Sequence, residues 1–201
     1  MKNSIRLFFV VLPLFGIVSC GPDFFSQKWE TSKAELSSAQ YVQIAGPNKH
    51  IKTPCIIEIN CPSEITSEYK SVNFSYPLAQ ILENLFNGVR DKLLEPPQYG
   101  TNSFKLVIDV QEATLSVSPN TFNKGGTATF NINLICRFYD PSEKRIFGTN
   151  IAVEKTLPID QKKHDYVFDS VYEASKECAI MIFKKILSDN RTVNVLKRFE
   201  K

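Results

Sequence analysis

Two stretches of the chain repeat apolar residues at intervals of three and four, which is the spacing of one buried face of an α-helix. The first stretch runs from Tyr76 to Leu94 and the second from Asp165 to Leu187. Ser75 is placed to cap the first helix, and Pro96-Pro97 would stop it, because proline cannot continue a helix. We therefore expect two amphipathic helices.

Three longer stretches alternate apolar and polar residues, which is the pattern of a strand buried on one side. They are Phe104–Ser118, Thr127–Asp140 and Arg145–Leu157. A loop at Pro119–Gly126 and a turn at Asp140–Glu143 separate them. Because such short connections join antiparallel neighbours, we expect three adjacent antiparallel strands.

Two shorter apolar runs, Tyr41–Gly46 and Cys55–Asn60, also have the composition of strands. Within the first long strand, the alternation changes phase near Ala113. A shift of one residue would turn every later side chain to the other face of the sheet. We therefore expect a β-bulge near Glu112, which would restore the buried face.

The elements follow one another as strand, helix, three strands and helix. We expect an α+β fold, in which a single antiparallel sheet carries two helices packed on one face. The length of 201 residues fits one domain, and 43% hydrophobic with 22% charged residues is ordinary for a globular protein. We place the folded domain at residues 41–188, between a polar tether at 20–40 and a basic tail at 189–201.

The first nineteen residues have the pattern of a secretory signal peptide. Lys2 and Arg6 form a short positive region, and the uncharged apolar run Leu7–Val18 follows. This run is too short to cross a bilayer, which takes about 20 apolar residues. We therefore expect residues 1–19 to be a leader that is removed on export.

The leader ends in Ile17-Val18-Ser19-Cys20, which resembles the lipobox of bacterial lipoproteins. The resemblance implies cleavage before Cys20, a diacylglycerol on its sulfur and a palmitate-type acyl chain on its amine, with no other cofactor. Several acyl chains hold a protein firmly in a membrane. Because Gly21 and not an aspartate follows the cysteine, the resemblance favours the inner leaflet of the outer membrane, facing the periplasm. The alternative is an ordinary secretory leader.

Four further cysteines, Cys55, Cys61, Cys136 and Cys178, would allow two disulfides in an exported chain. The first two would lie about 20 Å apart on one extended strand, whereas the Cα atoms of a disulfide lie within about 7 Å. The alternative is that the cysteines are buried as small apolar residues. The chain has two histidines and no CxxC motif, so we expect no metal site.

The charge of the chain does not indicate a nucleic-acid partner. Removal of the leader takes away Lys2 and Arg6 and no acid, so the formal net charge falls from +3 to +1. Six basic residues lie between Lys184 and Lys201, interleaved with apolar ones. This tail suits contact with anionic lipid or a partner groove, and the alternative is a solvated, frayed end.

No catalytic motif is visible: the chain lacks GxSxG, a P-loop, GxGxxG and HExxH. His164 and Asp165 are the one candidate acid–base pair. Adjacent residues seldom face each other, so this pair is more typical of a solvated helix start. We expect a protein without enzymatic activity, and a hydrolase on a lipid anchor is the alternative.

The stretch from Phe104 to Leu187, behind a lipobox and Cys-Gly, resembles the lipopolysaccharide-assembly lipoproteins of the LptE type. The resemblance implies a role without catalysis, in which the lipoprotein sits inside an outer-membrane β-barrel protein and helps it to assemble. Lipopolysaccharide or another lipid is a candidate ligand. Auxiliary lipoproteins of ABC-type lipid or solute transporters have a similar order of elements and are the alternative.

The candidate contact residues lie in two polar connections at the ends of the expected sheet. They are placed to meet a barrel wall or the phosphates of a lipid, and ordinary solvated turns are the alternative. They are Asn120, Lys124, Gly125, Gly126, Lys144 and Arg145.

Overall fold

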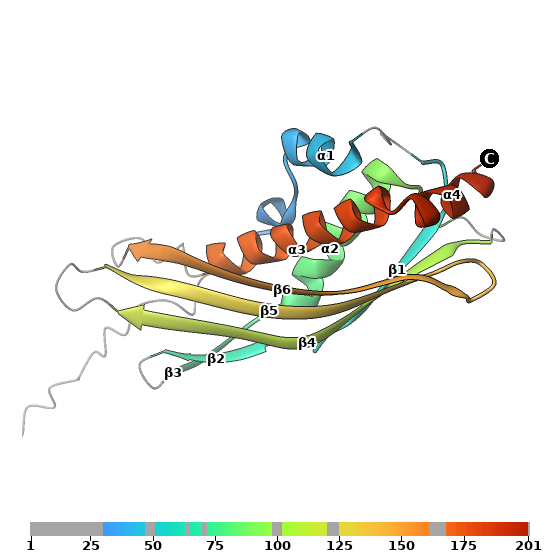
Figure 1. Ribbon diagram of the computed structural model, residues 1–201. Coiled ribbons are helices and arrows are strands. Elements are labelled where there is room, and N and C mark those ends of the chain that lie inside the picture. Colours follow the sequence, from blue (N-terminus) through green and yellow to red (C-terminus); the bar gives the residue numbers. More distant parts are fainter. Residues whose placement is uncertain are drawn as a thin grey trace, which may run out of the picture.

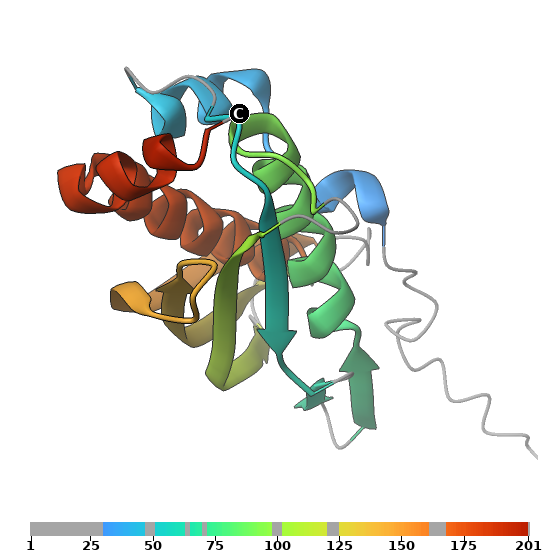
Figure 2. The same ribbon diagram turned by 90° about the vertical axis from the view of Figure 1, so that its right-hand side faces the viewer.

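The computed structural model describes residues 30–46, 51–62, 65–69, 72–97, 102–119, 125–160 and 168–200. Its main sheet has four strands in the order β1-β4-β5-β6, namely β1 (Cys55–Asn60), β4 (Phe104–Pro119), β5 (Gly125–Tyr139) and β6 (Arg145–Asp160). The described helices lie on one side of this sheet (Figures 1 and 2). They are η2 (Thr31–Ala34), α1 (Ser38–Ala45), α2 (Leu78–Leu93), α3 (Asp169–Ser188) and α4 (Asn190–Arg198). The α+β fold with helices packed on one face of the sheet is confirmed.

The sheet is mixed, so the expectation of a wholly antiparallel sheet is wrong for one pair of strands. Strands β4, β5 and β6 are antiparallel neighbours, whereas β1 pairs with β4 in parallel. Parallel neighbours need a long crossover, which usually contains a helix. Here the crossover contains α2 and a hairpin of β2 (Ile65–Tyr69) and β3 (Val72–Tyr76), which returns the chain to the end of the sheet where β1 began.

The bulge expected near Glu112 is present. The pairing of β4 with β5 shifts between Val110 and Glu112. After this shift Leu115 is again buried, as Leu106 and Ile108 are before it. The extra residue thus keeps the apolar side of the strand on the helices.

The core lies between the sheet and the two long helices. The rings of Phe86 on α2 and Phe183 on α3 have their centroids 6.0 Å apart, and Tyr76 meets Phe130 edge-on at 6.0 Å. A fully buried side chain of this size contributes about 2 to 3 kcal/mol, whereas a surface ion pair contributes about 0 to 1 kcal/mol. The core, and not the ion pairs, therefore holds the domain together.

The first long helix is confirmed, but its expected cap is wrong. Pro77 occupies the N-cap position and no side chain caps the helix. Ser75 instead belongs to β3, where it pairs with Thr66 of β2. The hairpin therefore holds this residue in extended backbone, and α2 begins only at Leu78.

The strand expected at Tyr41–Gly46 is also wrong, because this segment belongs to helix α1. Ser37 forms a capping box with Gln40: its side chain accepts a hydrogen bond from the Gln40 backbone, and the Gln40 side chain accepts one from the Ser37 backbone. This local arrangement satisfies free N–H groups at the start of a helix. It outweighs the composition of the apolar run.

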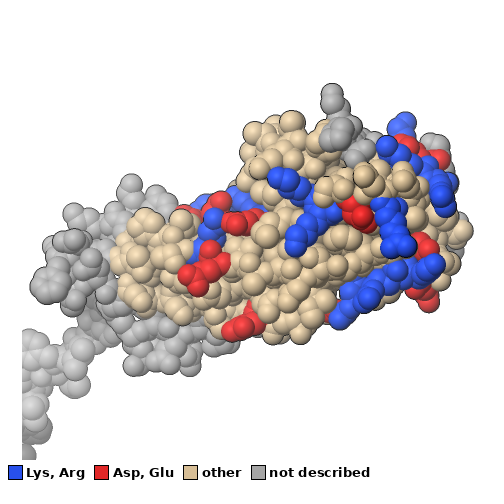
Figure 3. Space-filling model, viewed as in Figure 1, with Lys and Arg blue, Asp and Glu red and all other residues tan. Residues whose placement is uncertain are grey.

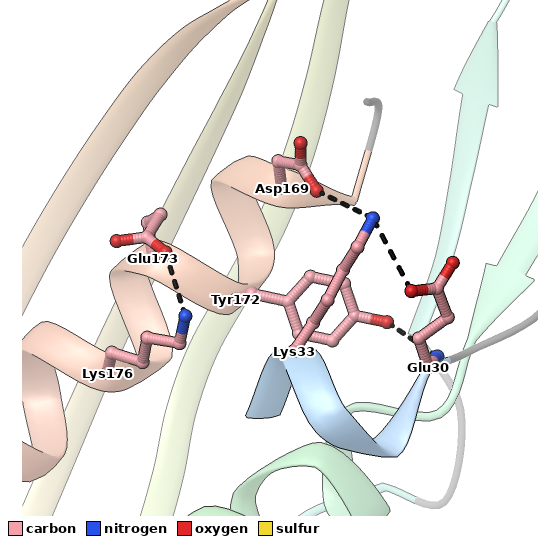
Figure 4. A network of polar contacts seen from close by, with 6 residues as sticks. All are labelled: Glu30, Lys33, Asp169, Tyr172, Glu173 and Lys176. Carbon is pink, nitrogen blue, oxygen red and sulfur yellow. Dashed lines mark hydrogen bonds and ion pairs between the residues drawn. The ribbon is translucent and has the colours of Figure 1, made fainter. Parts of the chain in front are cut away.

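Residues 30–40, expected to be part of a polar tether, belong to the folded domain. Ala34 and Leu36 are buried in the core. The backbone N–H of Glu30 donates to the hydroxyl of Tyr172 over 3.0 Å, and Lys33 lies 3.4 Å from Asp169 and 3.8 Å from Glu30 (Figure 4). A hydrogen bond and an ion pair therefore connect this segment to the first turn of α3.

The hydroxyl of Tyr172 is the acceptor that can be tested most simply. We expect Tyr172→Phe to lower the free energy of unfolding by about 1 kcal/mol, because the Glu30 N–H loses its hydrogen-bond partner. Urea unfolding followed by circular dichroism measures this. Tyr139→Phe on β5 is the control, since the Tyr139 hydroxyl forms no hydrogen bond within the described residues. Equal losses in both variants would contradict the assigned role of Tyr172.

Candidate functional site

The structure separates the two connections that were expected to form contacts. Gly125 and Gly126 begin β5 at one end of the sheet, while Lys144 and Arg145 lie at the β5–β6 turn at the other end (Figure 1). A strand as long as β5 spans about 50 Å. The two sets therefore do not form one site. Cys20, Asn120 and Lys124 lie outside the described residues.

The β5–β6 turn is built around Asp140. Its Oδ1 atom accepts hydrogen bonds from the backbone N–H groups of Ser142 at 2.9 Å and Lys144 at 3.0 Å, and from the Ser142 hydroxyl at 2.6 Å. The Ser142 hydrogen bond is the main cause that lowers the pKa of Asp140 below its usual value. Glu143 takes the left-handed backbone conformation, with φ of 62°. The turn therefore fixes the backbone of Lys144, whose side chain is exposed to solvent.

The C-terminal segment is a docked helix, so the alternative of a solvated, frayed end for the basic tail at residues 189–201 is wrong for its described part. Val193 and Leu196 of α4 are buried in the core. The Leu196 carbonyl accepts a hydrogen bond of 3.1 Å from the buried Thr53 hydroxyl. Phe199 meets the ring of Phe104 edge-on, with 5.3 Å between the centroids. The apolar side of α4 therefore packs on the domain.

Asp189 caps α4. Its carboxylate accepts hydrogen bonds from the backbone N–H of Thr192, at 3.1 Å, and from the Thr192 hydroxyl. The hydrogen bond from that hydroxyl is the main cause that lowers the pKa of Asp189. The short break between α3 and α4 is thus stabilised locally, and it sets the direction in which α4 leaves α3.

These two features bring cations together at one end of the molecule, which we call the basic end. The β5–β6 turn, the last turns of α3 and the exposed side of α4 gather there, and Figure 3 shows blue side chains over this part. Lys52 joins them, because its backbone N–H donates to Glu200 Oε1 over 3.3 Å. The cations of the basic end are Lys52, Lys144, Arg145, Lys184, Lys185, Arg191, Lys197 and Arg198.

The sequence analysis singled out most of the residues of the basic end, but it did not predict that they lie together. Lys144 and Arg145 were predicted to lie in a charged turn, and the residues from Lys184 onward were recognised as a basic segment. Their proximity depends on β6 running back along α3, where Lys185 Nζ donates to the Thr149 hydroxyl over 3.0 Å. Lys52 was not among the candidate residues, because it lies in a short connection without a recognisable motif.

The side of the sheet away from the helices, which we call the outer face, is mostly polar. Arg137 of β5 forms an ion pair with Asp109 of β4, and Asn60 of β1 donates to the same carboxylate over 2.7 Å. A shallow hollow of about 400 Å³ lies farther along, lined by the side chains of Thr114 and Asn131 among others. Only Val42, Ile56 and Phe199 are exposed large apolar residues in the described part of the chain.

The four described cysteines are free thiols and not disulfides. The alternative of burial as small apolar residues is confirmed for Cys55, Cys136 and Cys178, whereas Cys61 is partly exposed. Burial raises the pKa of Cys55, Cys136 and Cys178 to about 12, and that of the partly exposed Cys61 to about 11. The thiolate is the reactive form of cysteine. At neutral pH these groups are therefore protonated and unreactive.

Within the described ranges, no group of three or more His, Cys, Asp or Glu side chains is placed to hold a metal ion. No helix in the same ranges is both long enough and apolar enough to cross a bilayer. His164 and Asp165, the candidate acid–base pair, lie outside the described residues.

Comparison with known proteins gives no family for this chain. No family model matches the sequence, and no curated protein has a significant sequence match. Solved structures with a similar course of the chain include protein XCC0632 of family DUF330 from Xanthomonas campestris, with 14% identity over 71% of this chain and 88% of that one and a TM-score of 0.47.

Two further structures carry the word lipoprotein in their descriptions. The minor lipoprotein from Acinetobacter baumannii has 9% identity over 70% of this chain and 94% of that one, with a TM-score of 0.40. The protein from Caulobacter crescentus has 11% identity over 78% of this chain and 96% of that one, with a TM-score of 0.37. At these scores the similarities carry no argument about function.

Substitution of Asp189 tests whether its side chain stabilises the start of α4, which carries part of the basic end. We expect Asp189→Ala to lower the free energy of unfolding by about 1 kcal/mol, because two groups at the start of α4 lose their acceptor. Since folding lowers the pKa of this carboxyl, its contribution is present above a pH of about 4 and is lost as the pH falls through the lowered pKa. Hydrogen exchange of the α4 amides measures both effects. Asp189→Asn, which keeps an acceptor oxygen, should retain most of the protection.

Proposed function

We propose that this chain is a lipid-anchored protein of the bacterial cell envelope that acts by binding and not by catalysis. The observation that carries the proposal is the sequence Ile17-Val18-Ser19-Cys20 at the end of an apolar leader. The lipid on Cys20 would hold the domain at the periplasmic side of the outer membrane. The nine residues between Cys20 and the folded domain, which begins at Glu30, would give it room to meet a partner there.

For the partner we propose an outer-membrane β-barrel protein, as the resemblance to the LptE type implies. The shape of the domain supports this choice. The outer face is a broad sheet surface that is mostly polar, and the lumen of an outer-membrane barrel is polar as well. Its Arg137–Asp109 ion pair and neighbouring amides suit contact with polar walls better than contact with lipid chains.

The anchor is tested by metabolic labelling with radioactive palmitate in the native bacterium. We expect Cys20→Ser to abolish the label, because the lipidated sulfur is removed. Cys61→Ser is the matched control, since Cys61 is a partly exposed thiol of the folded domain and should leave the label unchanged. A label that survives in Cys20→Ser would contradict the anchor.

The partner is tested by photo-cross-linking in intact envelopes. We expect a cross-linker in place of Asn150 or Thr156, which are exposed on the outer face of β6, to capture a large outer-membrane barrel protein. The same group in place of Gln43, exposed on α1 on the helical side, should capture little of it. Capture of a component of an ABC transporter would contradict the barrel and favour the transporter lipoprotein. Recovery of an uncross-linked monomer would contradict both.

A further inference from the structure

Of the fifteen described lysines and arginines, all but Lys92, which takes part in an interaction of its own, fall into two groups. Six form ion pairs: Lys33, Arg90, Lys105, Arg137, Lys155 and Lys176. By contrast, the eight cations of the basic end form no ion pair within the described residues. Positive charge that is not neutralised is therefore concentrated in one region.

The carboxylates at the basic end cancel only part of this charge. Asp140 is held by the backbone of its own turn, and Asp189 is held by Thr192 at the start of α4. Glu200 accepts its hydrogen bond from the backbone of Lys52 and not from a cationic side chain. Including Glu95 and Glu143, five carboxylates face eight cations there.

The way in which α4 packs decides what kind of surface this is. An amphipathic helix that enters a bilayer needs a free apolar face. In α4 most of that face is already covered, because Val193 and Leu196 are buried in the core. Phe199, which follows the helix, packs on Phe104 on one side and is 43% exposed. What α4 offers to solvent is its cationic side, including Arg191, Lys197 and Arg198. Contact with a membrane would therefore be mainly electrostatic.

The basic end also lies within reach of the membrane that would hold the lipid. The chain enters the domain at Glu30, beside Tyr172 in the first turn of α3. Along the helix, Lys185 lies about 20 Å from Tyr172, at a rise of about 1.5 Å per residue. A fully extended chain from Cys20 to Glu30 can span about 35 Å. The tether is thus long enough for the basic end to touch the same leaflet.

We infer that the basic end binds the anionic phospholipid headgroups of the bilayer in which Cys20 is anchored. The lipid and the basic end would then form two separate contacts with the same membrane. Together these contacts would set the orientation of the domain relative to the bilayer. The setting rests on the proposed anchor, but the binding itself does not need it. A polybasic surface gains about fivefold in affinity for each cation near an anionic membrane.

The experiment uses the chain from residue 20 onward with Cys20→Ser, so that no lipid is attached. This chain retains the whole described core, whose first residue is Ala34. Co-sedimentation is measured with vesicles of phosphatidylcholine alone and with vesicles that also contain phosphatidylglycerol. We expect binding at low salt to the phosphatidylglycerol vesicles only, and loss of this binding at high salt, because screening weakens exposed charges.

Two triple variants distinguish the effect of where the positive charges lie from the effect of the net charge. Lys184→Gln with Arg191→Gln and Lys197→Gln removes three exposed cations of the basic end, and we expect vesicle affinity to fall on the order of a hundredfold. Lys33→Gln with Lys155→Gln and Lys176→Gln changes the net charge equally but removes ion-paired cations elsewhere. We expect this control to bind like the parent chain, with thermal unfolding checking that both variants fold.

Three results would overturn the inference: equal binding to both kinds of vesicle, binding that persists at high salt, or equal losses in the two triple variants. Failure of palmitate labelling at Cys20 would instead overturn the anchor, and it would leave vesicle binding unaffected. The two proposals can therefore fail separately.

Discussion

The burial of one side of α3 against the inner surface of β5 and β6 is the contact on which the rest of the molecule depends. Along its length α3 buries eleven residues, and its ring of Phe183 also meets α2. The segment at Glu30 is fastened to its first turn, and α4 continues from its last turn. Both chain ends of the described domain are therefore positioned by this one helix.

This arrangement divides the surface into regions with different chemistry. The helices cover one side of the sheet, so the outer face is left to polar side chains and internal ion pairs. The unpaired cations lie at the end where α3 meets α4 and where β5 turns into β6. A partner protein and a membrane surface would thus meet different parts of the domain, and neither contact would exclude the other.

The net charge conceals this division. The formal charge of +1 over residues 20–201 suggests a protein without electrostatic preference. Most of the cations on the body of the domain are neutralised by a neighbour, as Lys155 is by Glu177 at 2.6 Å. Those at the basic end are not. For interactions with a surface, the place of the charges matters more than their sum, because screening limits their effect to about 8 to 10 Å.

The sequence by itself determined the elements whose signals are local. Apolar residues at every second position predicted β4, β5 and β6, and a change of phase predicted the bulge beside Glu112. Apolar residues at intervals of three and four predicted α2 and α3. Each of these patterns reports a buried face, which the chain must have whatever its partners are. The pattern that predicts a leader ending before Cys20 is equally local, because it consists of neighbouring residues in the sequence.

Only the tertiary structure decided where elements without a strong pattern belong. The pairing of β1 with β4 depends on the path of the crossover, which no residue of β1 encodes. The capping box at Ser37 favours a helix in a segment whose composition is that of a strand. The position of α4 depends on its contacts with Thr53 and Phe104, which lie far away in the sequence. The basic end exists because separate segments meet there in space. Charge that lies far apart along a chain forms a surface only after the core has brought it together.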